Sequence, residues 1–116
     1  MNVADTIRQQ VGLGIFMSLG AHEFARLTSE GREIGLTFKA RILPFTKAGT
    51  RSPRPRIMRV TVELNHLDYY DVRVLYTARG QLIAHYDSSN IDAWQLSRIL
   101  LALDYDGQEV LNARVL

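Results

Sequence analysis

The sequence has no cysteine, so neither a disulfide nor a thiolate-bound metal can form. That absence fits a reducing cell interior. Long apolar runs are missing as well, because no stretch reaches the roughly 18 residues that a membrane-spanning helix needs. A secretory leader would begin with basic residues, whereas Asn2 and Asp5 stand there. We therefore expect a soluble protein that is located in the cytoplasm and does not contact a membrane.

Low-complexity sequence is absent too, and proline is confined to one segment. Apolar residues make up 47% of the 116 residues and charged residues 22%, which is the balance of an ordinary folded domain. A chain of this length can bury about two-thirds of its unfolded surface. The sequence thus predicts a single domain over residues 1–116.

The clearest pattern present is a hairpin between Arg56 and Tyr76. Apolar and polar residues alternate over 57–64 and again over 70–76. A period of two is typical of strands with one buried face and one wet face. Between them lies the segment Asn65-His66-Leu67-Asp68, which has the composition of a turn. We predict two antiparallel strands here, on which the other elements pack.

The first third of the chain predicts a helix followed by two strands. Apolar residues recur at helical spacing over the first 19 positions, although Gly12 and Gly14 favour a bend or a break there. Residues 22–27 and 34–40 then alternate as strands do.

The last third predicts a strand over 81–86 and a helix whose apolar stripe runs over 93–103. Ser88 or Ser89 is the expected helix cap, and Ser89 with Asp92 resembles a capping box. The expected fold is α+β, a two-layer sandwich in which an antiparallel sheet of three to five strands carries the N- and C-terminal helices on one face. Residues 108–116 form a tail that could pack as a further strand.

The segment at about 41–56 holds all three prolines, Pro44, Pro53 and Pro55. Proline lacks the N–H that a central strand needs, so this segment is predicted to be a long loop. Loops longer than about 12 residues in compact domains are usually functional or mobile. The loop is therefore the first candidate for a binding site.

The loop and its flanks are also basic. Seven of the 14 Lys and Arg residues fall between positions 39 and 59, where no Asp or Glu occurs. Such side chains contact phosphates without reading sequence, and an acid-free segment raises the local positive potential. A solvated connection would have a similar composition, and only Phe45 could stack on a base. We predict binding to nucleic acid or an acidic protein surface through Lys39, Arg41, Lys47, Arg51, Arg54, Arg56 and Arg59.

Several segments together resemble a group of small phage- and prophage-encoded proteins that have no assigned reaction. The strongest similarity is the hairpin pattern Thr-x-x-Leu-Asn followed by Asp-x-Tyr-Asp-Val over 61–72, and weaker similarity covers 9–12, 16–21 and 36–38. The loop between Ala40 and Arg56 is longer and more basic than in that group. The resemblance implies a phage or mobile-element protein acting inside a bacterial cell, and it implies no chemistry.

A second hypothesis is an inhibitor or adaptor that binds a host protein, such as one involved in defence. Trp94 lies off the apolar stripe of the last helix, and exposed tryptophan is enriched at interfaces. It could equally cover one end of the core. An unpaired edge strand over 22–27 could add to the sheet of a partner or of a second copy in a homodimer.

A third hypothesis is a metal-assisted hydrolase. If the three central strands form a meander, two His-x-Asp pairs and one more carboxylate come to the same end of the sheet, where they could bind a divalent ion. Those carboxylates could instead cap the turn. No recognised ligand or catalytic motif is present, so we expect a protein that is not an enzyme and has no cofactor. The residues in question are His66, Asp68, Asp71, His85 and Asp87.

Overall fold

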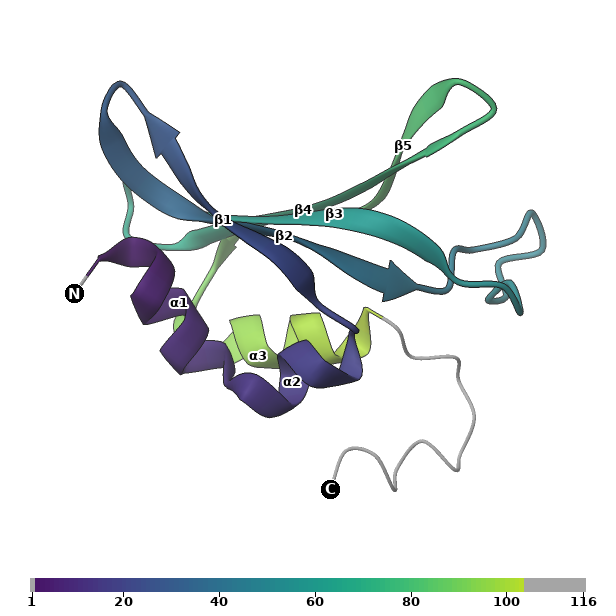
Figure 1. The fold of residues 1–116 in the computed structure, drawn as a ribbon, viewed down its shortest axis with the longest axis horizontal. Helices are drawn as coiled ribbons and strands as arrows, with labels where there is room; N and C mark the ends of the chain where they lie inside the picture. Colours follow the sequence, from purple (N-terminus) through teal and green to yellow (C-terminus); the bar gives the residue numbers. More distant parts are fainter. Residues whose placement is uncertain (1, 104–116) are drawn as a thin grey trace.

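A computed structural model describes residues 2–103, in which three helices lie on one side of a five-stranded antiparallel sheet (Figure 1). The predicted α+β sandwich is confirmed, with the maximum number of strands expected. The predicted tail over 108–116 lies outside the described residues. The elements are α1 (Val3–Val11), α2 (Leu13–Ser18), β1 (His22–Ser29), β2 (Arg32–Ile42), β3 (Arg56–Leu64), β4 (Tyr70–Ala78), β5 (Gln81–Ile91) and α3 (Ala93–Ala102).

The strands follow one another across the sheet in the order β1-β2-β3-β4-β5. The predicted central hairpin is confirmed, with Val62 of β3 opposite Val72 of β4. Alternate residues of β3 and β4 are fully buried under the helices, among them Val60 and Val74. The residues between them point to the opposite side of the sheet, which we call the open face.

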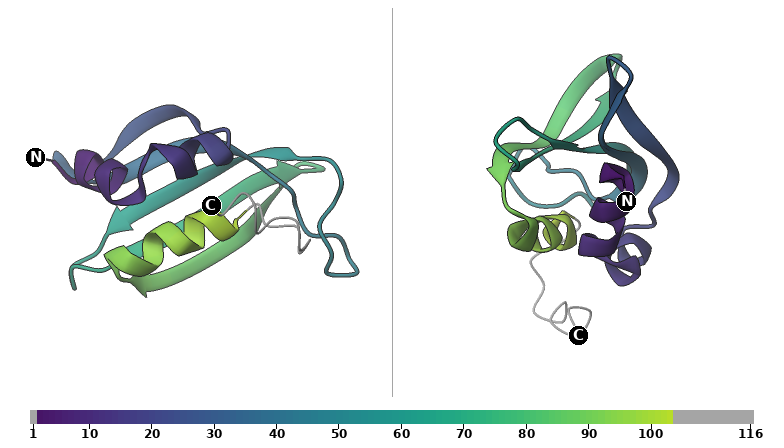
Figure 2. Two further views of the ribbon diagram at one scale, coloured as in Figure 1. Left: turned by 90° about the horizontal axis from the view of Figure 1, so that it is seen from below. Right: turned by 90° about the vertical axis from the view of Figure 1, so that its left-hand side faces the viewer.

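The helical layer begins with a capped helix. It ends at Gly12, where the sequence predicted a bend or a break. The side chain of Asn2 accepts a hydrogen bond from the Asp5 backbone N–H at 2.8 Å, which caps α1. Gly12 separates α1 from α2 with φ 91°, a conformation that glycine adopts at little cost. Figure 2 shows α1 and α2 following each other along one side of the layer, with α3 beside them. Ser97 of α3 donates a hydrogen bond to the Gln10 carbonyl of α1 at 3.0 Å.

The predicted start of the last helix is wrong. Asp92, not Ser88 or Ser89, is the N-cap of α3, and it forms a capping box with Gln95. The strand predicted over 81–86 continues to Ile91, which pairs with Tyr70 at the far end of β4. Pairing with β4 therefore keeps Ser88 and Ser89 extended, and the first good cap after the end of the strand is Asp92.

The sheet is curved, and its outer strands are irregular. The β1–β2 and β4–β5 hairpins rise away from the helices at opposite ends of the sheet (Figure 1). The pairing of β1 with β2 shifts register twice, once around Glu23, whose φ is 52°. The pairing of β5 with β4 also shifts twice. These shifts are β-bulges, which increase local twist.

Among residues 2–103, no helix is long and apolar enough to cross a membrane.

Candidate nucleic-acid interface

Three of the predicted binding residues lie together on the open face. Lys39 of β2 pairs directly with Arg59 of β3, and Arg41 lies two residues farther along β2. Their neighbours Ala40 and Val60 are buried under the helices, so the alternation of the strands turns the three basic side chains to the open face. They occupy the end of the sheet from which the long loop leaves.

The charge of Lys39 is shared with a carboxylate on the edge strand. Its Nζ lies 3.1 Å from Oε2 of Glu23, the residue at the bulge of β1. The hydrogen bond and the charge of Lys39 hold the pKa of Glu23 below its ordinary value. Lys39 is half-buried, so it adds less free positive charge to the surface than an exposed lysine would.

Arg41 and Arg59 are exposed, and within the described part of the chain neither forms an ion pair. Arg59 donates a hydrogen bond to Oγ1 of Thr37 at 3.3 Å, and this hydroxyl donates in turn to the Val60 carbonyl. The aliphatic stem of Arg41 packs beside Gly20. Both guanidinium groups therefore remain available to an anion.

The long loop between β2 and β3 contains a small hairpin of its own. Phe45 and Arg51 form an isolated antiparallel bridge. Above this bridge the Thr46 N–H donates to the Thr50 carbonyl at 2.8 Å, and the Gly49 N–H donates to the Thr46 carbonyl at 3.0 Å. Lys47 is exposed in the turn that these bonds close.

Arg51 differs from the other basic residues of the loop because it is half-buried against remote parts of the fold. Its guanidinium donates to the Leu43 carbonyl at 2.7 Å and to the Ala102 carbonyl of α3 at 3.3 Å. It also lies 3.0 Å from Nε2 of His85 and stacks on the ring of Phe45 with its Cζ 4.2 Å from the centroid.

The last two predicted residues, Arg54 and Arg56, are both exposed. Arg56 pairs with Ile42, and its guanidinium lies 5.8 Å from the ring centroid of Tyr76 and donates to the Thr77 carbonyl at 3.5 Å. Its side chain is thus directed across the end of β4. Arg54 makes no such side-chain contact with the residues described.

The structure places all seven predicted residues toward the loop end of the sheet, but it divides them by what their side chains contact. Arg51 and Arg56 are directed toward β4, β5 and α3. The other five residues form a group that we call the basic end, with three on the open face and two on the loop. The basic end comprises Lys39, Arg41, Lys47, Arg54 and Arg59.

One basic residue of the open face was missed from the sequence. Arg73 of β4 lies opposite Thr61 of β3, next to the strand that carries Arg59. The alternation of β4 could have indicated it, but it lies outside the acid-free segment. Its Nε is 3.7 Å from Oδ2 of Asp87 on β5, so its charge is partly balanced.

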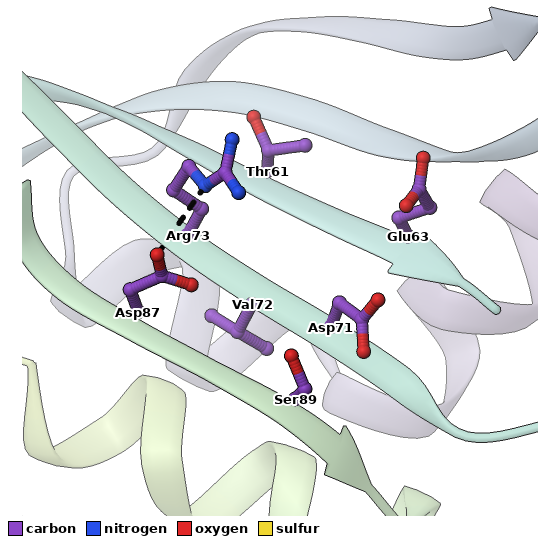
Figure 3. A pocket seen from close by; sticks show the side chains of 7 residues that line it. All are labelled: Thr61, Glu63, Asp71, Val72, Arg73, Asp87 and Ser89. Atoms are coloured by element: carbon purple, nitrogen blue, oxygen red, sulfur yellow. Dashed lines mark ion pairs between the residues drawn. The ribbon is translucent and has the colours of Figure 1, made fainter.

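The far end of the open face is acidic and hollowed. Figure 3 shows Arg73 between Thr61 and Asp87, with Glu63 and Asp71 farther along β3 and β4. These side chains help to line a hollow of about 140 Å³. Asp71 has a structural role, because its Oδ1 accepts hydrogen bonds from the Asn65 side chain at 2.9 Å and from the Asn90 backbone N–H at 3.2 Å. The acidic end limits where a polyanion can lie on this face.

The five His and Asp residues of the hydrolase hypothesis do not converge. His66 and Asp68 are exposed in the β3–β4 turn, whereas His85 lies near Arg51 at the loop end of β5. The predicted convergence is wrong because β5 extends to Ile91. The Ile91 end of β5 lies beside the β3–β4 turn, and His85 lies farther back along the strand. Asp71 and Asp87 hold other partners, and residues 2–103 contain no group of three or more His, Cys, Asp or Glu that could hold a metal ion.

Trp94 is 70% exposed in the first turn of α3, which confirms that it lies off the buried stripe. The guanidinium of Arg98, one turn later, lies 5.0 Å from its ring centroid. β1 is an edge strand of the sheet, as the adaptor hypothesis required. Trp94 belongs to the helical layer and β1 to the sheet, so the two features of the adaptor hypothesis lie in different layers.

Neither a protein-family model nor a curated protein nor a solved structure matches this chain at a significant level.

Proposed function

We propose that this protein binds nucleic acid through the basic end. The observation that carries the proposal is the pair Arg41 and Arg59, two exposed guanidinium groups on adjacent strands that form no ion pair among the described residues. The loop that leaves this end adds the exposed cations Lys47 and Arg54. Guanidinium groups match phosphate oxygens as planar, forked donors.

The chemistry of the surface favours contacts to the backbone over contacts to bases. The residues of β2, β3 and β4 that point to the open face include no aromatic side chain on which a base could stack. Phosphate contacts position a protein on nucleic acid without reading its sequence. The proposed activity is therefore binding with little sequence preference and without catalysis.

The proposed setting is the cytoplasm of a bacterial cell that carries a phage or mobile element. It rests on the resemblance of the hairpin over 61–72 to small phage-encoded proteins. A chain with this role would act as an accessory protein on the nucleic acid of the element or of its host.

The test is binding to mixed duplex and single-stranded fragments at about 50 and 200 mM salt, a range in which several phosphate contacts cost orders of magnitude in affinity. We expect salt-sensitive binding, and the double variant Arg41→Gln, Arg59→Gln should lower the slope of log affinity against log salt by about 2. Arg32→Gln is the matched control, because Arg32 is an exposed arginine at the β1–β2 turn, at the opposite end of the sheet. No binding at the lower salt would overturn the proposal.

A second candidate is an adaptor that binds a host protein through Trp94. Its 70% exposure and its contact with Arg98 favour this function, since tryptophan and arginine are enriched at the centres of interfaces. Such a complex would tolerate salt and would be lost on Trp94→Ala, whereas the double arginine variant would leave it intact.

A further inference from the structure

We propose that Arg51 is a positioning residue that orders the basic loop, and that it does not itself contact phosphate. The inference rests on the nucleic-acid function proposed above. It divides the basic residues of the loop into one that holds the loop in place and others, Lys47 and Arg54, that face a ligand.

The guanidinium of Arg51 joins three segments that are distant in the sequence. One nitrogen, Nη1, donates to the Leu43 carbonyl at the start of the loop and lies 3.0 Å from Nε2 of His85 on β5. The other, Nη2, donates to the carbonyl of Ala102 in the last turn of α3. Carbonyls in the last turn of a helix lack intrahelical partners and attract cations, so Arg51 satisfies a group that the helix leaves open.

The contact with His85 ties the loop to β5. A guanidinium has only donors, so Nε2 of His85 is the acceptor in this contact. The His85 ring also stacks on Phe45, with centroids 5.0 Å apart and planes 15° from parallel. Arg51 lies over the same Phe45 ring. The base of the loop hairpin is thus held by two ring contacts and by directional hydrogen bonds.

Holding the base of this hairpin also holds its tip. Phe45 and Arg51 pair with each other, and the bonds between Thr46, Gly49 and Thr50 continue directly from that pair to Lys47. Fixing the backbone of a free residue costs conformational entropy. If the loop is ordered before binding, that cost does not reduce the affinity for the ligand. Arg51 can therefore raise affinity without touching the nucleic acid.

A lysine cannot take over this role. One ammonium group is a compact point charge, whereas the contacts of Arg51 are made from two nitrogens of a planar group that also stacks on Phe45. Arg51→Lys should therefore behave like Arg51→Met, although it keeps the charge. This distinguishes positioning from simple electrostatic attraction.

The first measurement is amide hydrogen exchange in the free protein. In Arg51→Met, and to a smaller extent in His85→Phe, we expect the amides of Thr46, Gly49 and Ser52 to exchange about tenfold faster, because the loop opens locally more often. The matched control Arg54→Met should leave them unchanged. Wild-type exchange rates for the amides of β3 and β4 in all variants would show that the fold is intact.

The second measurement is the salt dependence of binding to a duplex fragment. We expect Arg51→Met and Arg51→Lys to weaken binding about fivefold to tenfold with the wild-type slope, and Arg54→Met to lower the slope by about 1. A slope lowered by Arg51→Met as much as by Arg54→Met, or loop amides that exchange at the wild-type rate, would overturn the positioning role. If the wild-type protein binds no nucleic acid, the proposed function is overturned, and exchange alone decides whether Arg51 orders the loop.

Discussion

The two connections of β3 are built in opposite ways. Five residues join β3 to β4, and the side chain of Asn65 organises most of this turn. Its Oδ1 accepts from the backbone N–H groups of Leu67 at 2.9 Å and Tyr69 at 3.2 Å, and its Nδ2 donates to Asp71 and Asn90. The connection from β2 to β3 spans residues 43–55 and contains a small hairpin whose base is also held by residues outside the loop.

The long connection is ordered by contacts from far along the chain. Arg51 reaches a carbonyl of α3 that is 51 positions away and a histidine of β5 that is 34 positions away. A turn encoded by one residue stays closed whenever its strands are paired, whereas a loop held by remote elements can open while the sheet stays intact. We therefore expect substitutions at the loop end to affect the proposed binding and substitutions at the turn end to affect stability.

The largest expected effect is a loss of folding stability from a substitution near the β3–β4 turn. A Cβ at Gly35 of β2 would overlap the backbone carbonyl oxygen of Val62 on β3, so Gly35→Ala must force the two strands apart. We expect the free energy of unfolding to fall by about 3 kcal/mol, measured by urea denaturation. Gly14→Ala is the control, because space around Gly14 in α2 is open and alanine should be neutral or stabilising there. Equal stability of Gly35→Ala and the wild type would contradict the close approach of the strands.

Smaller losses of stability are expected from substitutions in the two connections of β3, and the two losses should differ. Asn65→Ala removes both acceptor and donor from the turn, and it should lower the free energy of unfolding by about 2 kcal/mol. Arg51→Met removes a similar number of hydrogen bonds at the loop end, but we expect it to change global stability by less than about 1 kcal/mol, since the loop can open alone. Equal losses in the two variants, compared by urea denaturation, would show that the loop is part of the cooperative core.

The smallest expected effect is on the ion pair of Glu23 and Lys39. The pKa of Glu23 lies below its ordinary value of 4.5, mainly through the hydrogen bond and charge of Lys39. The ionised form therefore favours the fold above pH 4.5, and this contribution is lost as the pH falls through the folded-state value. Lys39→Met should raise the pKa of Glu23 in an NMR titration, and Lys47→Met should not. A pKa that stays low in Lys39→Met would assign the shift to another group.

The fold was predictable where short-range patterns carry it. The alternation over 57–64 and 70–76 identified the central hairpin and its buried face, and Gly12 marked the helix break. The end of β5 was not predictable in the same way, because Ser88, Ser89 and Asp92 are all competent caps. The choice depends on the pairing of Ile91 with Tyr70, which no local pattern reveals.

The candidate site shows the same division. Composition alone identified the acid-free segment, and strand alternation would have separated Lys39, Arg41 and Arg59 from the rest. The holding role of Arg51 could not be read from the sequence, because its partners lie in a strand and a helix whose positions depend on the whole fold. Charge alone does not distinguish an arginine that binds from one that anchors.

The irregular outer strands have a consequence for the behaviour of this protein at high concentration. In neither β1 nor β5 does pairing with the neighbouring strand stay in register for more than four residues. An incoming strand needs a longer regular row of free N–H and C=O groups to extend a sheet. The bulges therefore guard both edges of the sheet against edge-to-edge aggregation.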